Sequence, residues 1–182
     1  TAGQELILDG RAGRVIVEPT PAEVQLYRER DIRIREWEQE LILLAHLDAI
    51  TPDKQPVLLR ANIDLPGEGV NARSHGARGI GLDRTEFFVV GRSAAPEEEE
   101  QYRCYREVVD VFPEDAVYIR TFDLGGDKFP LFLHMPPEEN PFLGWRAIRV
   151  CLDTPELFRA QLRALLRVTA HGDVRIMIPL VN

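Results

Sequence analysis

Strand and helix patterns alternate four times along residues 57–182, and this alternation constrains the fold more than any other feature. Strands are predicted from short apolar runs at 57–63, within 79–88, at 116–122 and at 174–181. Helices are predicted between them at 67–77, 97–112, 145–152 and 156–170. Strands that alternate with helices pair in parallel, because a parallel connection needs a crossover about as long as a helix. The sequence therefore predicts an α/β fold built on a parallel sheet.

The first 56 residues follow a different pattern. A small hairpin is predicted at 4–18, with glycines in its turn. Thr20 is then a predicted helix N-cap, and Glu23 completes a capping box with it. Apolar residues recur at helical spacing to about Ala49, and Pro52 helps to end the helix. A helix of that length is more typical of a connector than of an ordinary core.

Composition limits the partners of the chain. Its 182 residues suit one domain or a domain with a short appendage, and the 45% of hydrophobic residues suffice for a core. A net charge of −8 argues against a nucleic-acid surface built on bulk charge. No apolar run approaches the roughly 18 residues of a membrane span, and no signal peptide is visible at 1–20, so a cytoplasmic location is expected. Cys104 and Cys151 lack the spacing of a zinc site and are expected to be reduced thiols.

Two predicted strands end in an arginine that is followed by threonine and then by acidic residues. The runs are GIGLDRTEF at 79–87 and YIRTFDLGGDK at 118–128. Arg84 and Arg120 thus hold matching positions at strand ends, where β/α barrels carry functional side chains. Two guanidinium groups so placed form a clamp for a doubly charged anion, because the planar fork matches phosphate and carboxylate oxygens. The alternative is that each is a surface or ion-paired arginine.

Other polar residues near these strand ends extend the candidate site. Asn62 lies near the end of the first strand, and Lys128 follows two glycines in the loop after the third. Those glycines allow a tight turn or a close approach of the backbone to a ligand. Four acidic residues are predicted to orient the guanidinium groups: Asp83, Glu86, Asp123 and Asp127.

A third run, EENPFLGWRAIR at 138–149, combines a turn signal with the start of a helix, and alone it also fits a packed aromatic loop with ion-paired arginines. The runs GIGLDRTEFF, YIRTFDLGGDK and EENPFLGWRAIR, in this order and spacing, resemble the PEP-binding barrel of Enzyme I of the bacterial phosphotransferase system (phosphoenolpyruvate–protein phosphotransferase; PEP, phosphoenolpyruvate). The hairpin and long helix are similar to the segments that precede this barrel. The resemblance therefore covers the whole chain.

The resemblance implies three segments. Residues 1–19 would be the end of the phosphohistidine (swivelling) domain, 20–56 a linker helix, and 57–182 the first half of a PEP-binding (β/α)8 TIM-type barrel. Since only four of eight strands fall within the chain, we expect a fragment that is inactive alone. Half a barrel exposes two sheet edges, and exposed edges invite pairing with another copy, so a chain of this length on its own is expected to be oligomeric, swapped or marginally stable.

The resemblance also implies an activity: Mg²⁺-dependent transfer of the PEP phosphoryl group to a histidine of the enzyme, then to a phosphocarrier protein of the sugar or nitrogen branch. By position, Arg84 and Arg120 would bind PEP phosphate and carboxylate oxygens, with Lys128 as a further phosphate contact. The site-shaping residues would be Asn62, Asn140, Trp145 and Arg146.

The remaining machinery is expected outside the chain. The Mg²⁺ ligands and the catalytic cysteine would follow residue 182, and the phosphoryl-accepting histidine would precede Thr1, so no catalytic residue and no metal ligand is expected here. The resemblance further implies a homodimer, with neither nucleic acid nor membrane as a partner. Two alternatives remain open: a degenerate PEP-binding or dimerisation module without turnover, and a barrel of the PEP synthase or pyruvate phosphate dikinase type.

Overall fold

The computed structural model describes residues 3–125, 130–134, 140 and 143–181. The chain forms two compact units, Thr1–His46 and Leu47–Asn182, and each is described by itself.

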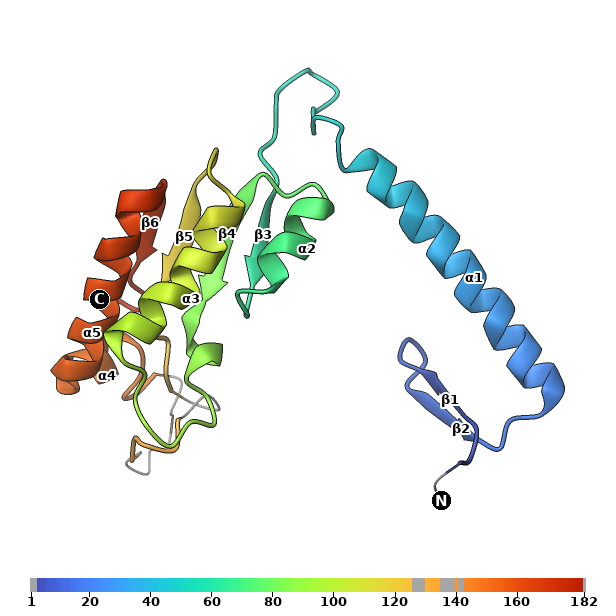
Figure 1. Ribbon diagram of the computed structural model, residues 1–182, viewed down its shortest axis with the longest axis horizontal. Helices are drawn as coiled ribbons and strands as arrows, with labels where there is room; N and C mark the ends of the chain where they lie inside the picture. The colour runs from blue at the N-terminus through green and yellow to red at the C-terminus, as the bar shows by residue number, and fades with distance from the viewer. Residues whose placement is uncertain (1–2, 126–129, 135–139, 141–142, 182) are drawn as a thin grey trace. The chain divides into compact units, whose positions relative to one another are not determined.

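The first unit begins with the predicted hairpin. Strands β1 (Leu6–Asp9) and β2 (Arg14–Val17) pair in antiparallel fashion, with Asp9 opposite Arg14 next to the turn (Figure 1). The Asp9 carboxylate accepts hydrogen bonds from the backbone N–H groups of Arg11 (3.1 Å) and Ala12 (2.9 Å). These bonds, chiefly the one from Ala12, lower the pKa of Asp9, because they favour its charged form.

Helix α1 (Pro21–Leu44) starts at the predicted capping box. The Thr20 hydroxyl accepts from the Glu23 N–H, and the Glu23 carboxylate accepts from the Thr20 N–H at 2.8 Å. The helix is shorter than predicted, since it ends at Leu44 and not near Ala49. The Ala49 carbonyl instead accepts a hydrogen bond from the Val57 N–H at 2.8 Å. Residues 49–57 therefore form a turn and do not continue the helix.

The second unit contains the predicted parallel sheet. Its strand order matches the order along the chain: β3 (Arg60–Ile63), β4 (Gly79–Arg84), β5 (Val117–Arg120) and β6 (Val174–Met177). The first and last strands are shorter than predicted. Pairing of β3 with β4 begins only at Arg60, and β6 pairs as far as Met177, opposite the last residue of β5.

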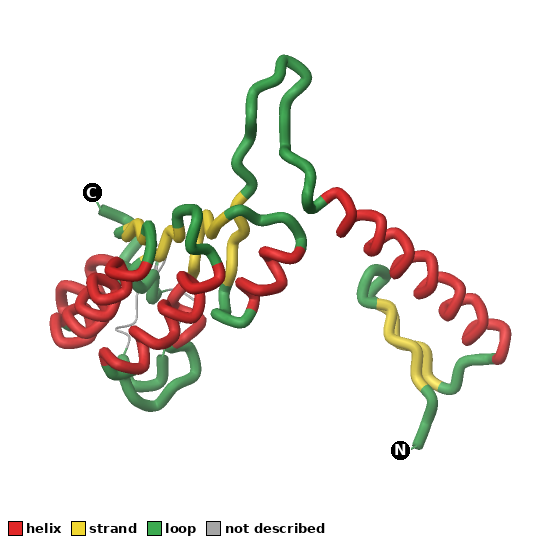
Figure 2. Tube along the Cα trace, turned by 45° about the horizontal axis from the view of Figure 1, so that its top comes forward, coloured by secondary structure: helices red, strands yellow, loops and turns green. Residues whose placement is uncertain are grey.

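The helices of this unit supply the crossovers between parallel strands, and two 3-10 turns accompany them. Their bounds are α2 (Glu68–Ser74), η1 (Thr85–Phe88), α3 (Glu98–Val111), α4 (Ile148–Asp153), α5 (Pro155–Val168) and η2 (Thr169–His171). Helices α3 and α5 lie on the same side of the sheet (Figures 1 and 2). The core between them and the strands is formed by buried apolar side chains: Ile63, Ile80, Tyr105, Val108, Val109, Phe112, Val117, Ile119, Ala164, Leu165 and Val168.

Side chains alternate across β5. Val117 and Ile119 belong to the core under the helices, whereas Tyr118 and Arg120 are only half-buried and point to the other face. Helix α4 begins at Ile148 and not at Trp145, where it was predicted to begin. Ala147 has a φ of +52°, which is incompatible with a right-handed helix. The Ala147 N–H instead donates to the Leu124 carbonyl at 2.9 Å.

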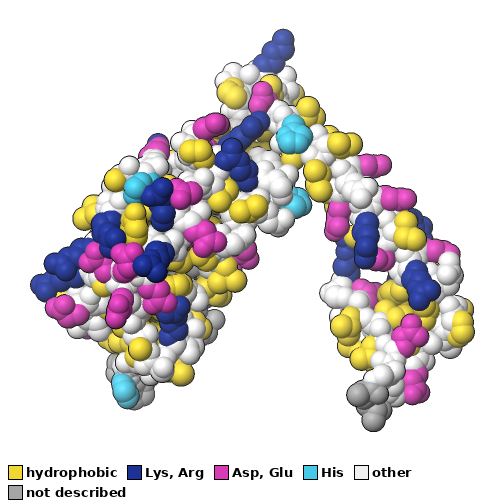
Figure 3. Space-filling view, in the orientation of Figure 1, with side chains coloured by type: hydrophobic (Ala, Val, Ile, Leu, Met, Phe, Trp, Pro, Cys, Tyr) yellow, Lys and Arg dark blue, Asp and Glu magenta, His cyan; other side chains and the backbone are white. Residues whose placement is uncertain are grey.

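The surface over α3 and α5 carries charges of both signs (Figure 3). Arg167 of α5 donates to Glu98 at 2.9 Å and to Glu99 at 2.7 Å, so the two helices are also joined across their exposed sides. None of the described helices combines the length and apolar character needed to cross a bilayer.

Candidate functional site

The structure brings Arg84 and Arg120 together. They are register partners at the last positions of β4 and β5. Neighbouring strands lie about 4.8 Å apart, so the two backbones present adjacent arginines at one edge of the sheet. The sequence placed them only at matching strand ends; the register makes them neighbours.

Arg84 is held by an acidic residue that the sequence did not single out. Its Nη1 donates to Oδ1 of Asp64 at 2.7 Å, and both side chains remain about one-third exposed, at 34% and 33%. Asp64 is the first residue after β3. Its position is that of a residue at the carboxyl end of a strand, and this signal could have identified it.

Arg120 is more deeply set, with 16% of its side chain exposed. It pairs with the fully buried carboxylate of Glu86 in η1, and its Nη1 lies 3.3 Å from Oδ2 of Asp123. Glu86 and Asp123 therefore orient this guanidinium group as predicted. The Nε of Arg120 is buried and lacks a hydrogen-bond partner in the part of the chain that is described. A buried donor without a partner costs free energy, so this N–H favours an added acceptor.

Asp123 also joins Arg120 to Arg146, which precedes α4. The Arg146 Nε donates to Asp123 Oδ1 at 2.8 Å and its Nη2 donates to Oδ2 at 3.0 Å, a two-point contact that fixes both groups. Gly125 makes this approach possible. A Cβ at Gly125 would lie 2.5 Å from Cγ of Arg146, and the φ of +149° also disfavours any other residue.

Asp83 does not orient the arginines, so this prediction was wrong. Within the described residues it forms no ion pair with arginine, and its strand position is opposite Ile119, a residue of the core under the helices. Side chains alternate along a strand, so the residue before Arg84 points to the other face. Burial, with the nearby carboxylates of Glu86 and Asp64, raises the pKa of Asp83 to about 7.

Three other predicted site residues lie in the described part of the chain: Asn62, Asn140 and Trp145. Asn62 is exposed on β3, beside Leu82 of β4. Trp145 donates from its indole N–H to Asp153 at 2.5 Å, and Asn140 is exposed and accepts a backbone bond at 3.1 Å. Lys128 and Asp127 lie outside the described residues.

The charges at the strand ends balance. Among the described residues, three guanidinium groups are matched by three carboxylates: Arg84, Arg120 and Arg146 by Asp64, Glu86 and Asp123. The described arginines would therefore recognise an anion chiefly through oriented N–H donors. Each guanidinium group has five such donors, and the ion pairs of Arg84 and Arg120 leave some of them for a ligand.

The described residues do not fit a metal site. Among them, no three His, Cys, Asp or Glu side chains lie close enough to hold an ion. The carboxylates nearest the arginines are already engaged with guanidinium groups. A divalent cation at this sheet edge would need ligands from other residues.

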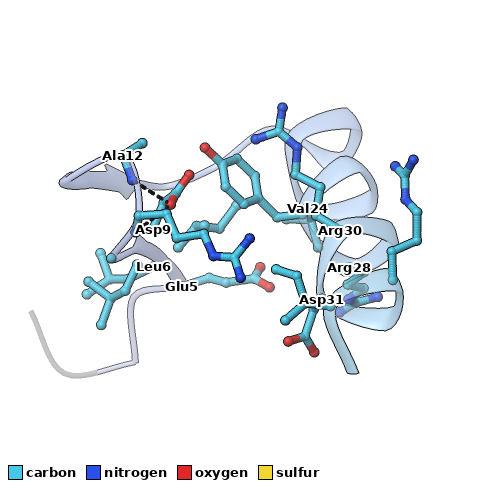
Figure 4. Close-up of a pocket in the computed structure, with 15 residues that line it drawn as sticks. Glu5, Leu6, Asp9, Ala12, Val24, Arg28, Arg30 and Asp31 are labelled. Atoms are coloured by element: carbon cyan, nitrogen blue, oxygen red, sulfur yellow. Dashed lines mark hydrogen bonds between the residues drawn. The ribbon is translucent and has the colours of Figure 1, made fainter. Parts of the chain in front are cut away.

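A separate hollow lies in the first unit, between the hairpin and α1 (Figure 4). Its volume is about 980 Å³, and its walls mix apolar side chains such as Leu6 and Val24 with charged ones such as Arg28 and Asp31. None of the predicted site residues that the structure describes lines it.

Comparison with known proteins places the chain in a family. Residues 38–182 match the PEP-binding domain of PEP-utilising enzymes. The chain is 45% identical over 179 residues to the phosphoenolpyruvate-protein phosphotransferase of Staphylococcus epidermidis, covering 98% of this chain and 31% of that protein. Identity to the proteins of the same name is 44% in Staphylococcus carnosus (99% and 31% covered) and 43% in Geobacillus stearothermophilus (98% and 31% covered). The chain thus spans about a third of the length of the curated relatives it matches, and it belongs to the PEP-utilising enzyme family through its PEP-binding domain.

Proposed function

We propose that this chain supplies part of the PEP site of a phosphoenolpyruvate–protein phosphotransferase. The complete enzyme would transfer the PEP phosphoryl group to one of its own histidines, and then to a phosphocarrier protein of the sugar or nitrogen branch. The match to the PEP-binding domain and the similarity to proteins of this name support the proposal.

The proposal gives each segment a place in that larger enzyme. The parallel sheet is the first half of a (β/α)8 barrel, residues 20–56 link it to the preceding domain, and residues 1–19 end the phosphohistidine domain. The complete protein is a cytoplasmic homodimer. Mg²⁺, which in such an enzyme would neutralise phosphoryl charge, is held by residues outside this chain, and the chain alone is inactive.

The adjacency of Arg84 and Arg120 carries the proposal. Phosphoryl transfer depends on positioning and on stabilising charge, more than on covalent help from the protein. PEP bears a phosphate and a carboxylate, and two neighbouring guanidinium forks can bind both. Glu86 and Asp123 hold Arg120 in place before the ligand arrives, so little reorganisation is needed on binding.

The other site residues act around this pair. Lys128 is assigned a further phosphate contact. Arg146 acts through Asp123, which it shares with Arg120. Asn62, Asn140 and Trp145 are assigned to shaping the site.

Titration calorimetry with PEP and Mg²⁺ tests the proposal, in the natural protein whose reading frame contains these residues. Arg84→Ala and Arg120→Ala are each expected to weaken PEP binding about 10- to 100-fold, because each removes charge-assisted hydrogen bonds worth about 1.5–3 kcal/mol. Arg84→Lys should recover only part of the loss, since an ammonium group lacks the fork. Arg103→Ala is the matched control, because Arg103 is an exposed arginine of α3 that pairs with Glu99. Wild-type PEP affinity in both alanine variants would refute the assignment.

A further inference from the structure

A buried set of hydrogen bonds lies on the helix side of the sheet, behind the ends of β4 and β5. Gln161 of α5 is at its centre and is fully buried. Its Nε2 donates to the Thr85 hydroxyl and to the Tyr105 hydroxyl, both at 3.1 Å. Its Oε1 accepts from the Phe122 N–H at 3.0 Å.

This set is connected directly to both arginine-bearing strand ends. Thr85 follows Arg84, and its hydroxyl donates to the Arg120 carbonyl at 2.8 Å. Phe122 lies two residues beyond Arg120. Gln161 thus contacts Thr85, which follows Arg84, and Phe122, which lies just beyond Arg120. Thr85 in turn links the end of β4 to the end of β5.

The direction of these bonds is fixed by chemistry. A backbone N–H can only donate, so the Phe122 N–H requires the oxygen end of the Gln161 amide to face it. The amide nitrogen then donates to both hydroxyls. The hydroxyl protons are left for the Arg120 carbonyl and for Oε1 of Gln101, which accepts from Tyr105 at 3.1 Å.

Gln161 occupies a position that packing alone would give to an apolar residue. The buried positions around it on α5 are Leu157, Ala164, Leu165 and Val168. A buried amide must have its hydrogen bonds satisfied, and a satisfied network in a low-dielectric core holds its members rigidly. Leucine would fill this space but would leave the buried Phe122 N–H without its acceptor, so the amide fixes the geometry of these segments as well as satisfying the core.

We propose that Gln161 and Thr85 are positioning residues for the arginine pair. They set the spacing between the ends of β4 and β5. This spacing determines the distance between the two guanidinium groups that bind one anion. The inference rests on the proposed PEP site. A single ligand held at two points is sensitive to displacements of about 1 Å, so a small shift of one strand end weakens binding markedly.

The test compares Thr85→Val with Thr85→Ser in the natural full-length protein. Valine keeps the shape of threonine but has no hydroxyl, whereas serine keeps the hydroxyl. PEP affinity is measured by calorimetry, and unfolding by urea titration. We expect Thr85→Val and Gln161→Met to weaken PEP binding about tenfold or more, and Thr85→Ser to stay within about twofold of wild type.

Val108→Ala separates positioning from simple loss of stability. Val108 is fully buried in the same core, and it belongs neither to the hydrogen-bond set nor to the arginine pair. It should lower stability at least as much as Thr85→Val and leave PEP affinity unchanged. If Gln161→Met does not fold, the Thr85 pair decides the question by itself.

The outcomes distinguish this inference from the proposed function. Equal PEP affinity in Thr85→Val and wild type, with Arg84→Ala impaired, overturns the positioning role alone. A loss of affinity in Val108→Ala that matches that of Thr85→Val also overturns it, because stability would then explain both. Normal binding by Arg84→Ala and Arg120→Ala overturns the proposed function, and the positioning role with it.

Discussion

Asp83→Asn should stabilise the protein, and the gain should grow with pH. Asp83 is 6% exposed, and burial is the main cause that raises its pKa from 3.8 to about 7. The negative charges of Glu86, Asp64 and Glu68 raise it further. Asparagine is nearly the same size and carries no charge at any pH, so the substitution isolates the effect of ionisation.

The sign follows from proton binding. Between pH 4 and pH 7 the folded state keeps a proton that the unfolded chain has lost, so the free energy of unfolding falls as pH rises through this window. Above about pH 7 both states are ionised and the penalty is constant. The difference between 3.8 and about 7 corresponds to about 4 kcal/mol, an upper bound that relaxation and water penetration reduce.

Urea denaturation at half-unit steps from pH 4.5 to 8.5 measures the effect. The free energy of unfolding of Asp83→Asn should exceed that of wild type by a few kcal/mol at pH 8, and the gain should shrink toward zero near pH 4. Glu107→Gln is the control, because Glu107 is an exposed acid on α3 and its removal should give no comparable trend. A gain that is the same at pH 5 and pH 8, or a loss at pH 8, would refute the reasoning.

Three further predictions concern other parts of the chain. Gly125→Ala should destabilise the protein by roughly 2 kcal/mol in urea titrations, because of its positive φ and the contact with Arg146, and it should weaken PEP binding in the same preparation. Burial raises the pKa of Cys104 and of Cys151 to about 12, so a colorimetric thiol reagent at pH 8 should react with neither thiol in the folded protein and with both in urea. Thr20→Ala removes the N-cap of α1 and should lower its stability by about 1 kcal/mol, measured as lost helical circular dichroism on heating.

The sheet and the arginine pair could be predicted because they depend on local pattern. Apolar runs separated by helical periodicity favour parallel strands, and arginines at the ends of such runs lie at the same edge of the sheet; that Arg84 and Arg120 are direct neighbours follows from the register of β4 and β5. The capping box at Thr20 is likewise encoded within four residues. Strand ends were less predictable, since β6 pairs only as far as β5 extends beside it.

The partners of the arginines depend on three-dimensional packing. Asp64 follows β3 and pairs with Arg84; its strand-end position marks it as a candidate, but the contact itself is set by the packing of the two strands. The error over Asp83 was avoidable, because strand alternation already separates it from Arg84. The burial of Gln161 could have been predicted from the sequence. It is a polar residue four positions from both Leu157 and Leu165, on the apolar side of an amphipathic helix. Its partners, however, come from segments up to 76 residues away.

The strand order β3-β4-β5-β6 has a consequence for synthesis on the ribosome. Each strand pairs with the one made just before it, so the sheet can grow in step with translation. The chain must extend from Arg120 to Met177 before β6 can cover the edge of β5. At 5–20 residues per second this interval lasts on the order of 3–11 s. During that time the β5 edge and the apolar side chains that α5 later covers are open, so the nascent chain is expected to engage ribosome-associated chaperones at this stage.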